Sequence, residues 1–116
     1  MIARDLRLRR NSDFERVRSQ GRSWSSRSVV LAVTPNDLGT NRYGFAVGKR
    51  AGNSVVRNRA KRLMREATRQ CHPHLRQGHD IVLIARNSFT PEMTQAEITQ
   101  QIETLARRAK LVQEGQ

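Results

Sequence analysis

Hydrophobic and polar positions divide much of the chain into short strands. Residues 28–34 (SVVLAVT) are mostly apolar and β-branched, and residues 42–47 (RYGFAV) place an apolar side chain at every second position. Both patterns are typical of strands, and we expect these two strands to pair antiparallel. Residues 80–85 (DIVLIA) predict an apolar strand that is buried on both faces. Residues 21–26, which contain Trp24, predict a short strand that leads into a tight turn.

Helical signals lie on both sides of these strands. Ser12 and Glu15 have the spacing of a capping box, which predicts a short helix that starts near Ser12 and ends at Gly21. Thr90 and Pro91 are expected to open a last helix, because proline suits the first helical turn. This last helix is predicted to cover the sheet with apolar side chains at helical spacing, namely Ile98, Ile102, Leu105, Ala109 and Val112.

A third helix is predicted after residue 52, with Asn53 or Ser54 as its cap. At about 100° per residue, its apolar positions occupy a single arc of about 100° on a helical wheel. These positions are Val56, Ala60, Leu63, Met64, Ala67 and Cys71. The rest of the wheel carries six cations and a single anion, Glu66. We expect the apolar face to be buried. Because a surface helix usually mixes both signs of charge and this one does not, we expect its charged face to meet an anionic partner.

The cations of this helix form two rows. The first row, called the ridge below, repeats every four residues and consists of Arg57, Lys61, Arg65 and Arg69. The second row consists of Arg59 and Arg62. Guanidinium groups at intervals of ~6 Å suit the phosphates of a nucleic-acid backbone. Asn58 lies between the rows, where its amide can bind a base edge or a ribose 2′-hydroxyl. Lys49 and Arg50 stand just upstream, where the preceding strand ends.

The predicted order of elements is helix, short strand, strand, strand, helix, strand and helix. We therefore expect an α+β fold, a two-layer α-β sandwich with helices packed on a sheet of about four strands. The basic helix joins two strands, so this unit is predicted to be a βαβ crossover. No repeat or linker divides the 116 residues, which predicts a single domain over residues 1–116. Residues 1–10 are expected to form a basic N-terminal arm, extended or loosely ordered.

The charge of the chain narrows the class of partner. The formal net charge is +12, and all but three of the 22 basic residues are arginine. Such a balance indicates nucleic acid or an anionic membrane, and arginine favours RNA because guanidinium groups bind phosphates and stack on bases. No apolar run approaches the length of a membrane span, and no signal-peptide pattern opens the chain. With one cysteine, the sequence predicts a cytoplasmic RNA-binding domain without membrane association.

No group of residues predicts a catalytic or metal site in the protein itself. Cys71, His72, His74 and His79 lie close together in sequence, but their spacing matches no common zinc pattern. The segment around Lys49 lacks the spacing of a nucleotide-binding loop. A two-metal nuclease needs clustered carboxylates, and here the aspartates are scattered at Asp5, Asp13, Asp37 and Asp80.

Residues 52–66 (GNSVVRNRAKRLMRE) resemble the signature of the bacterial ribonuclease P protein subunit, with Arg57-Asn58-Arg59 at its centre. The resemblance extends over most of the chain, at Asp13, Phe14, Gly21, residues 47–50 and the strand IVLIAR that ends at Arg86. It implies an α-β sandwich whose βαβ crossover is left-handed, against the usual rule.

The resemblance also implies a function. Ribonuclease P removes the 5′ leader of precursor tRNA by hydrolysis, and its active site and magnesium ions belong to the catalytic RNA. The protein is therefore expected to contribute no catalytic residue and no cofactor of its own, and its implied partners are the catalytic RNA and precursor tRNA. The alternative is a small ribosomal or assembly protein that binds structured RNA without a reaction. A self-sufficient nuclease is disfavoured because the sequence lacks a carboxylate cluster.

Two sets of site residues follow from the resemblance. The family's Arg-Asn-Arg helix and its basic neighbours contact the catalytic RNA, which implies a set of Lys49, Arg50, Arg57, Asn58, Arg59, Lys61, Arg62, Arg65 and Arg69. A cleft between the first helix and the sheet guides the single-stranded leader, which implies a set of Phe14, Arg18 and Arg86. Arg18 and Ala32 stand where the family often has aromatics, so this cleft is expected to depend more on charge than on stacking. Phe14 is equally consistent with packing in the core.

Overall fold

The computed structural model describes residues 6–8, 10–48, 52–90 and 92–113. The elements follow the predicted order, with a short 3-10 helix added after the basic helix. They are α1 (Asn11–Gln20), β1 (Arg22–Ser25), β2 (Val29–Pro35), β3 (Arg42–Val47), α2 (Ser54–Cys71), η3 (His72–His74), β4 (His79–Ala85) and α3 (Gln95–Arg108). The α+β class and the number of strands agree with the prediction.

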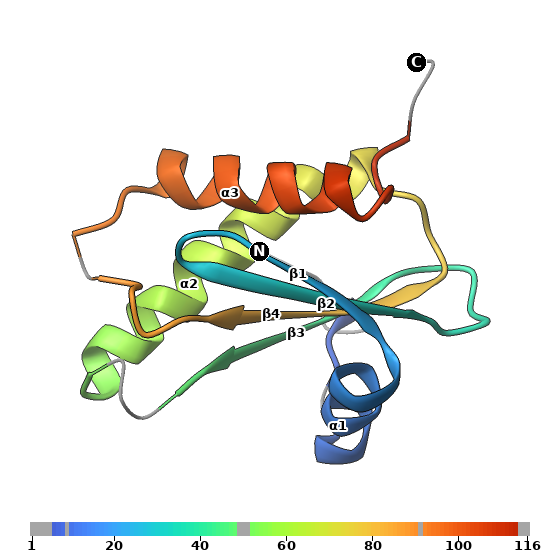
Figure 1. Ribbon diagram of the computed structural model, residues 1–116, viewed down its shortest axis with the longest axis horizontal. Helices are drawn as coiled ribbons and strands as arrows, with labels where there is room; N and C mark the ends of the chain where they lie inside the picture. The colour runs from blue at the N-terminus through green and yellow to red at the C-terminus, as the bar shows by residue number, and fades with distance from the viewer. Residues whose placement is uncertain (1–5, 9, 49–51, 91, 114–116) are drawn as a thin grey trace.

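The four strands form one mixed sheet in the order β1-β2-β4-β3 (Figure 1). β2 pairs antiparallel with β1 and β4, whereas β3 pairs parallel with β4. The predicted pairing of β2 with β3 is wrong, because β4 lies between them. Parallel neighbours need a long crossover, and α2 provides it, so the predicted βαβ unit is confirmed. The central place also buries β4, the strand with the most continuous apolar run.

Helices pack on both faces of this sheet. α2 and α3 lie on one face and α1 on the other (Figure 1). The main core lies under α2 and α3, and its largest fully buried apolar side chains are Tyr43, Leu31, Met64, Ile81, Leu83, Ile98 and Leu105. The face under α1 holds a much smaller cluster, which consists of Leu8, Val17, Ala32 and Val82 with Phe14 and Ile84 packed against it.

The start of α1 differs from the prediction, and its end agrees with it. The N-cap residue is Arg10, which makes no side-chain cap hydrogen bond. Because the helix starts at Asn11, Ser12 lies inside the first turn, where its hydroxyl cannot serve as the predicted cap. α1 ends at Gly21, where a β carbon would lie 2.4 Å from the Val17 carbonyl oxygen. Only glycine fits this approach without a shift of the backbone.

The first residues of α2 and α3 test two further predictions. Asn53 caps α2, as one of the two predicted candidates, because its side chain accepts a hydrogen bond from the Val56 N–H. α3 starts after Thr94, which forms a capping box with Glu97. The predicted start at Thr90 is therefore wrong, and Pro91 lies outside the described residues. A reciprocal capping box satisfies two helix N–H groups, which makes Thr94 the stronger start signal.

The described part of the N-terminal arm extends the sheet at its β3 edge. The Leu8 N–H donates to the Tyr43 carbonyl oxygen at 2.7 Å, and Arg7 forms an isolated parallel bridge with Tyr43. Residues 6–8 therefore lie along the outer side of β3. This contact places Arg7, from the start of the chain, close to the basic helix α2.

Candidate nucleic-acid interface

α2 has the two faces that its sequence predicts. Ala60, Leu63, Met64, Ala67 and Cys71 are buried, and Val56 is half-buried at the start of the same face. On the other side, Asn58, Arg59, Arg62 and Arg69 are exposed, and Arg57, Lys61 and Arg65 are half-buried. The apolar arc was thus predicted correctly. Lys49 and Arg50, the two upstream members of the predicted RNA-binding set, lie outside the described residues.

Three of the four ridge cations have no anion to neutralise them within the described part of the chain. Ion pairs there join Asp13, Asp80 and Glu66 to arginines, and of the ridge cations only Arg69 takes part. Arg69 donates to both oxygens of Glu66, at 2.9 and 2.5 Å. The hydrogen bonds from Arg69 and Gln70 lower the pKa of Glu66 to about 2. Arg69 is therefore the ridge cation that is least available to a partner.

Arg65 stands out among the ridge cations because it reaches the edge of the sheet. Its guanidinium carbon lies 5.8 Å from the centre of the Phe45 ring, a cation–π contact that lies beside Arg7. Burial and the like charge of Arg7 lower the pKa of Arg65. Two guanidinium groups that repel each other favour an anion between them. The sequence did not indicate this pair, since the two residues are far apart along the chain.

The Nε atoms of three half-buried arginines on this side have no hydrogen-bond acceptor among the described residues. The Nε atoms of Arg7, Arg57 and Arg65 are inaccessible to solvent and find no hydrogen-bond partner among the described residues. Buried donors without a partner cost free energy, and proteins rarely leave them so. Because these Nε atoms are closed to solvent, an acceptor from outside the chain reaches them only after the side chains rearrange.

A small cavity of about 90 Å³ joins the ridge to α1. Its lining comes from the arm, from α1, from β3 and from α2, and consists of Arg7, Leu8, Phe14, Tyr43, Gly44, Phe45 and Arg65. A volume of this size equals about three water molecules, which is enough for a phosphate group but not for a whole nucleotide. The cavity therefore connects the predicted RNA-binding set to Phe14 of the predicted leader cleft.

The predicted cleft residues are spread along one face of the sheet. Phe14 is half-buried over Gly44, so it both packs in the small cluster and borders the cavity. Arg18 is exposed in the last turn of α1. Arg86 follows the far end of β4, where its Nη1 donates to the Ser26 carbonyl oxygen at 2.7 Å. Ala32, at a position where the family often has an aromatic, is buried under α1.

The sheet between Phe14 and Arg86 is not fully covered. Val30, Ala46 and Ile84 are cross-strand neighbours on the face that carries α1, and all three are half-buried. They form an aliphatic floor that leads from the edge of α1 toward Arg86. This floor offers apolar contact but no aromatic ring for stacking.

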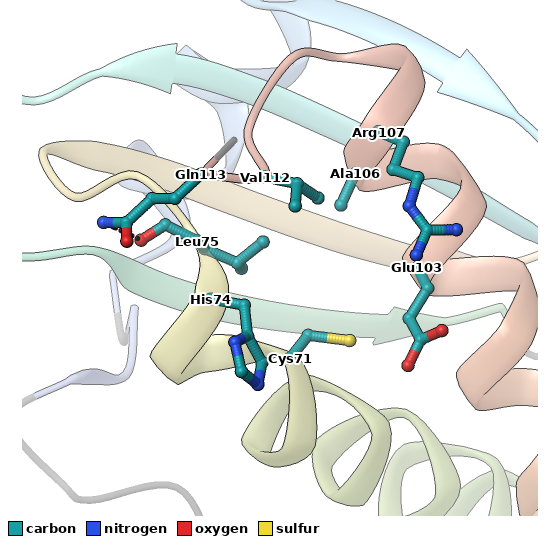
Figure 2. A pocket seen from close by; sticks show the side chains of 8 residues that line it. All are labelled: Cys71, His74, Leu75, Glu103, Ala106, Arg107, Val112 and Gln113. Carbon is teal, nitrogen blue, oxygen red and sulfur yellow. Dashed lines mark hydrogen bonds between the residues drawn. The ribbon is translucent and has the colours of Figure 1, made fainter. Parts of the chain in front are cut away.

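The remaining candidates are Cys71 and the three histidines near it in sequence. Among the described residues, no group of three or more His, Cys, Asp or Glu side chains could hold a metal ion. Cys71, His74 and Glu103 line a cavity of about 280 Å³ between α2, α3 and the segment after α3 (Figure 2). Burial raises the pKa of Cys71 to about 11. His72 binds the Tyr43 hydroxyl at 2.6 Å through Nδ1, which supports Tyr43 as a core residue. No described helix has the length and apolar character needed to cross a membrane.

Comparison with known proteins identifies the family. The protein-family model described as "Ribonuclease P" matches residues 2–110. The chain belongs to the ribonuclease P protein family. The ribonuclease P protein component of Symbiobacterium thermophilum is 45% identical over 92% of this chain and 93% of its own length. That of Natranaerobius thermophilus is 41% identical over 93% of both chains.

Solved structures of ribonuclease P proteins have the same fold. The Staphylococcus aureus protein superposes with a TM-score of 0.83 at 32% identity, over 93% of this chain and 98% of that chain. The Thermotoga maritima protein gives a TM-score of 0.80 at 27% identity, over 88% and 96% of the two chains. The chain is thus a protein subunit of ribonuclease P, an RNA-catalysed endoribonuclease, and assists removal of the 5′ leader from precursor tRNA. The alternative of a ribosomal or assembly protein is set aside by these matches.

Proposed function

We propose that the cationic side of α2 is the surface that binds the catalytic RNA of ribonuclease P. The observation that carries this proposal is the set of ridge cations without an ion pair among the described residues, namely Arg57, Lys61 and Arg65. Phosphate oxygens supply the opposite charge that these cations lack. The proposed RNA-binding set is Lys49, Arg50, Arg57, Asn58, Arg59, Lys61, Arg62, Arg65 and Arg69, all within a single RNA-binding domain of residues 1–116.

The single-stranded leader of precursor tRNA is proposed to lie along the face of the sheet beside α1. Phe14 offers part of its ring for stacking, and Arg18 is exposed one turn further along α1. The aliphatic floor of Val30, Ala46 and Ile84 extends this path toward Arg86. Arg7 is a new member of the proposed site, since it shares the cavity of Phe14 and Arg65. Contacts of this kind tolerate any base, so we expect little preference for leader sequence.

We further propose that the protein acts in the cytoplasm, with the catalytic RNA and precursor tRNA as its partners. The magnesium ions of the holoenzyme are proposed to be held by the RNA. The donor set of the described residues does not fit a metal of its own. Asp80 is surrounded by two arginines, and Glu66 is paired with Arg69. Asp13 is the acid nearest to Asp80, but the same two arginines lie between them, and no group of three or more potential ligands gathers among the described residues.

Reconstitution tests the assembly role. The purified chain is mixed with a bacterial ribonuclease P RNA and precursor tRNA at low magnesium, and the rate of leader removal is compared with that of the RNA alone. We expect the protein to raise the rate, because its cations replace part of the magnesium that screens RNA phosphates. A rate no higher than that of RNA alone would refute the proposed role, and cleavage by the protein without RNA would place the active site in the protein.

Substitutions in the cleft test the leader path. Phe14→Ala and Arg18→Ala should each weaken holoenzyme affinity for precursor tRNA by roughly 5-fold, the lower part of the range for one stacked base, and leave mature tRNA unaffected. The Arg18→Ala loss should shrink at high salt and the Phe14→Ala loss should not, because only the first removes a charge. Equal losses for precursor and mature tRNA would refute a leader contact at these residues.

A further inference from the structure

The buried carboxylate of Asp80 collects hydrogen bonds from three side chains. Its side chain has no exposed area. On its own face of the sheet it accepts from Arg42, through Nε at 2.9 Å and Nη2 at 2.7 Å, and from the Asn36 side-chain amide at 3.0 Å. The third donor is Nη2 of Arg16, which comes from α1. A single buried charge thus joins α1 to β3 and β4.

Asp13 completes a cluster of four alternating charges. Its Oδ1 lies 4.0 Å from Nη2 of Arg16 and 3.9 Å from Nη2 of Arg42. Burial alone would raise the pKa of Asp80, but the hydrogen bonds from Arg42, Asn36 and Arg16 outweigh it and lower the pKa. The Asp80 carboxylate therefore stays charged at neutral pH. The cluster sets two carboxylates against two guanidinium groups.

Apart from this cluster, α1 has few anchors on the sheet. It is ten residues long and has no side-chain N-cap. Val17 is its only fully buried residue, and Phe14 packs only in part. A helix this short has little stability of its own and depends on its packing contacts. Two apolar side chains can hold α1 against the sheet, but they restrict its rotation and sliding much less than a directional ion pair does.

We propose that Arg16 is a positioning residue for the leader cleft, and that its bond to Asp80 sets the orientation of α1. This orientation places the Phe14 ring over Gly44, beside the cavity that Arg65 lines. The inference rests on the proposed role of the cleft. The Arg16 guanidinium is committed to Asp80, so it acts on the leader through Phe14 and Arg18 and does not contact the leader itself.

The geometry separates orientation from stability. Asp80 keeps Arg42 and Asn36 when Arg16 is removed, so the carboxylate remains satisfied and the sheet stays intact. Replacing Asp80 instead would leave Arg16 and Arg42 with only the more distant Asp13, which is far more disruptive. Arg16→Ala is therefore the substitution that loosens α1 and leaves the sheet intact.

Binding measurements with Arg16→Ala holoenzyme test the proposal. We expect affinity for precursor tRNA to fall by roughly 3- to 5-fold, below the combined loss of Phe14→Ala and Arg18→Ala, because these are the two groups that Arg16 positions. Affinity for mature tRNA and for the catalytic RNA should not change. Arg76→Ala, which removes an exposed charge far from α1 in sequence, is the matched control and should leave all three affinities unchanged. Arg16→Lys keeps the charge and one donor, and should recover most of the loss.

A double-mutant cycle distinguishes positioning from direct contact. In a Phe14→Ala, Arg18→Ala background, adding Arg16→Ala should change precursor affinity by less than about twofold, because the groups it positions are gone. A full loss in that background, or one that disappears at high salt, would show that Arg16 itself contacts the leader and would overturn the inference. Thermal unfolding of each variant serves as the folding control. If Arg16→Ala does not fold, Arg16→Gln, which removes the charge but keeps a polar side chain, is carried through the same cycle, and additive losses there would equally overturn it.

The outcomes for the cleft and for Arg16 are separable. If Phe14→Ala does not discriminate precursor from mature tRNA, the proposed cleft fails and the inference fails with it. If Phe14→Ala discriminates but Arg16→Ala behaves like wild type, only the inference fails.

Discussion

Gly44 is the position where one added methyl group tests the packing between α1 and the sheet. It lies in β3 directly under the Phe14 ring. A β carbon at residue 44 would lie 2.6 Å from Cζ and 2.7 Å from Cε1 of Phe14, and 3.3 Å from Cδ1 of Leu8. The first two distances are much shorter than a van der Waals contact, so Gly44→Ala forces the ring to move.

The change in unfolding free energy caused by Gly44→Ala is the difference between two opposing effects. Overpacking of this kind typically destabilises a protein by ~1–3 kcal/mol, and we expect the lower half because Phe14 is half-buried and can swing outward. Alanine is better than glycine inside a strand by ~0.5–1 kcal/mol. The net destabilisation of Gly44→Ala should therefore be about 1 kcal/mol. In a Phe14→Ala background the clash disappears, and the same change should stabilise the protein by ~0.5–1 kcal/mol.

Urea and thermal unfolding of the wild type, both single variants and the double variant measure this reversal of sign. A change of 1 kcal/mol should move the melting temperature by about 4 °C in a chain of this length. Gly39→Ala is the control, since nothing lies within 4 Å of an added β carbon there, and it should be neutral within ~0.5 kcal/mol. Because the ring is displaced, Gly44→Ala holoenzyme should also lose affinity for precursor tRNA but not for mature tRNA.

Equal destabilisation by Gly44→Ala with and without Phe14 would refute this reasoning, because the ring would then not lie over residue 44. A variant that keeps its stability but loses precursor affinity would show that the ring moves at no cost, and that Phe14 serves the leader more than the core.

Further predictions concern α2 and the buried titratable groups. Arg57→Ala and Lys61→Ala should each weaken binding to the catalytic RNA and reduce the slope of log affinity against log salt by about one, and unchanged slopes would remove the ridge from the interface. Leu63→Ala, on the buried face, should instead destabilise the fold by ~2–5 kcal/mol, and a stable variant with lost RNA affinity would mean that the two faces are reversed. Burial raises the pKa of Cys71 from 9.0 to about 11, so its contribution to stability is present below pH 9 and is lost as the pH rises toward 11. Cys71→Ala should therefore flatten the decline in unfolding free energy over this interval, and a curve that keeps its shape would contradict a protonated buried thiol.

Local patterns in the sequence were sufficient for α2. The 3.6-residue period assigned its buried arc correctly, and Asn53 was one of two predicted caps. These features depend on residues within one or two turns of each other, so they can be seen without knowing the rest of the fold. The excess of arginine and the Arg57-Asn58-Arg59 motif likewise indicated an RNA-binding surface and the family, because composition and a contiguous motif do not depend on how the chain folds.

Contacts between distant segments were decided only by the tertiary structure. Strand patterns do not encode their neighbours, so β4 between β2 and β3 was missed, although each strand was predicted. Arg7 and Arg65 meet because the arm pairs with the edge of β3. Asp80 was one of several scattered carboxylates in the sequence, yet its partners Arg42 and Arg16 lie 38 and 64 residues away. Such pairs form because folding must satisfy a buried charge with whichever donors the strand order and the placement of α1 bring within reach.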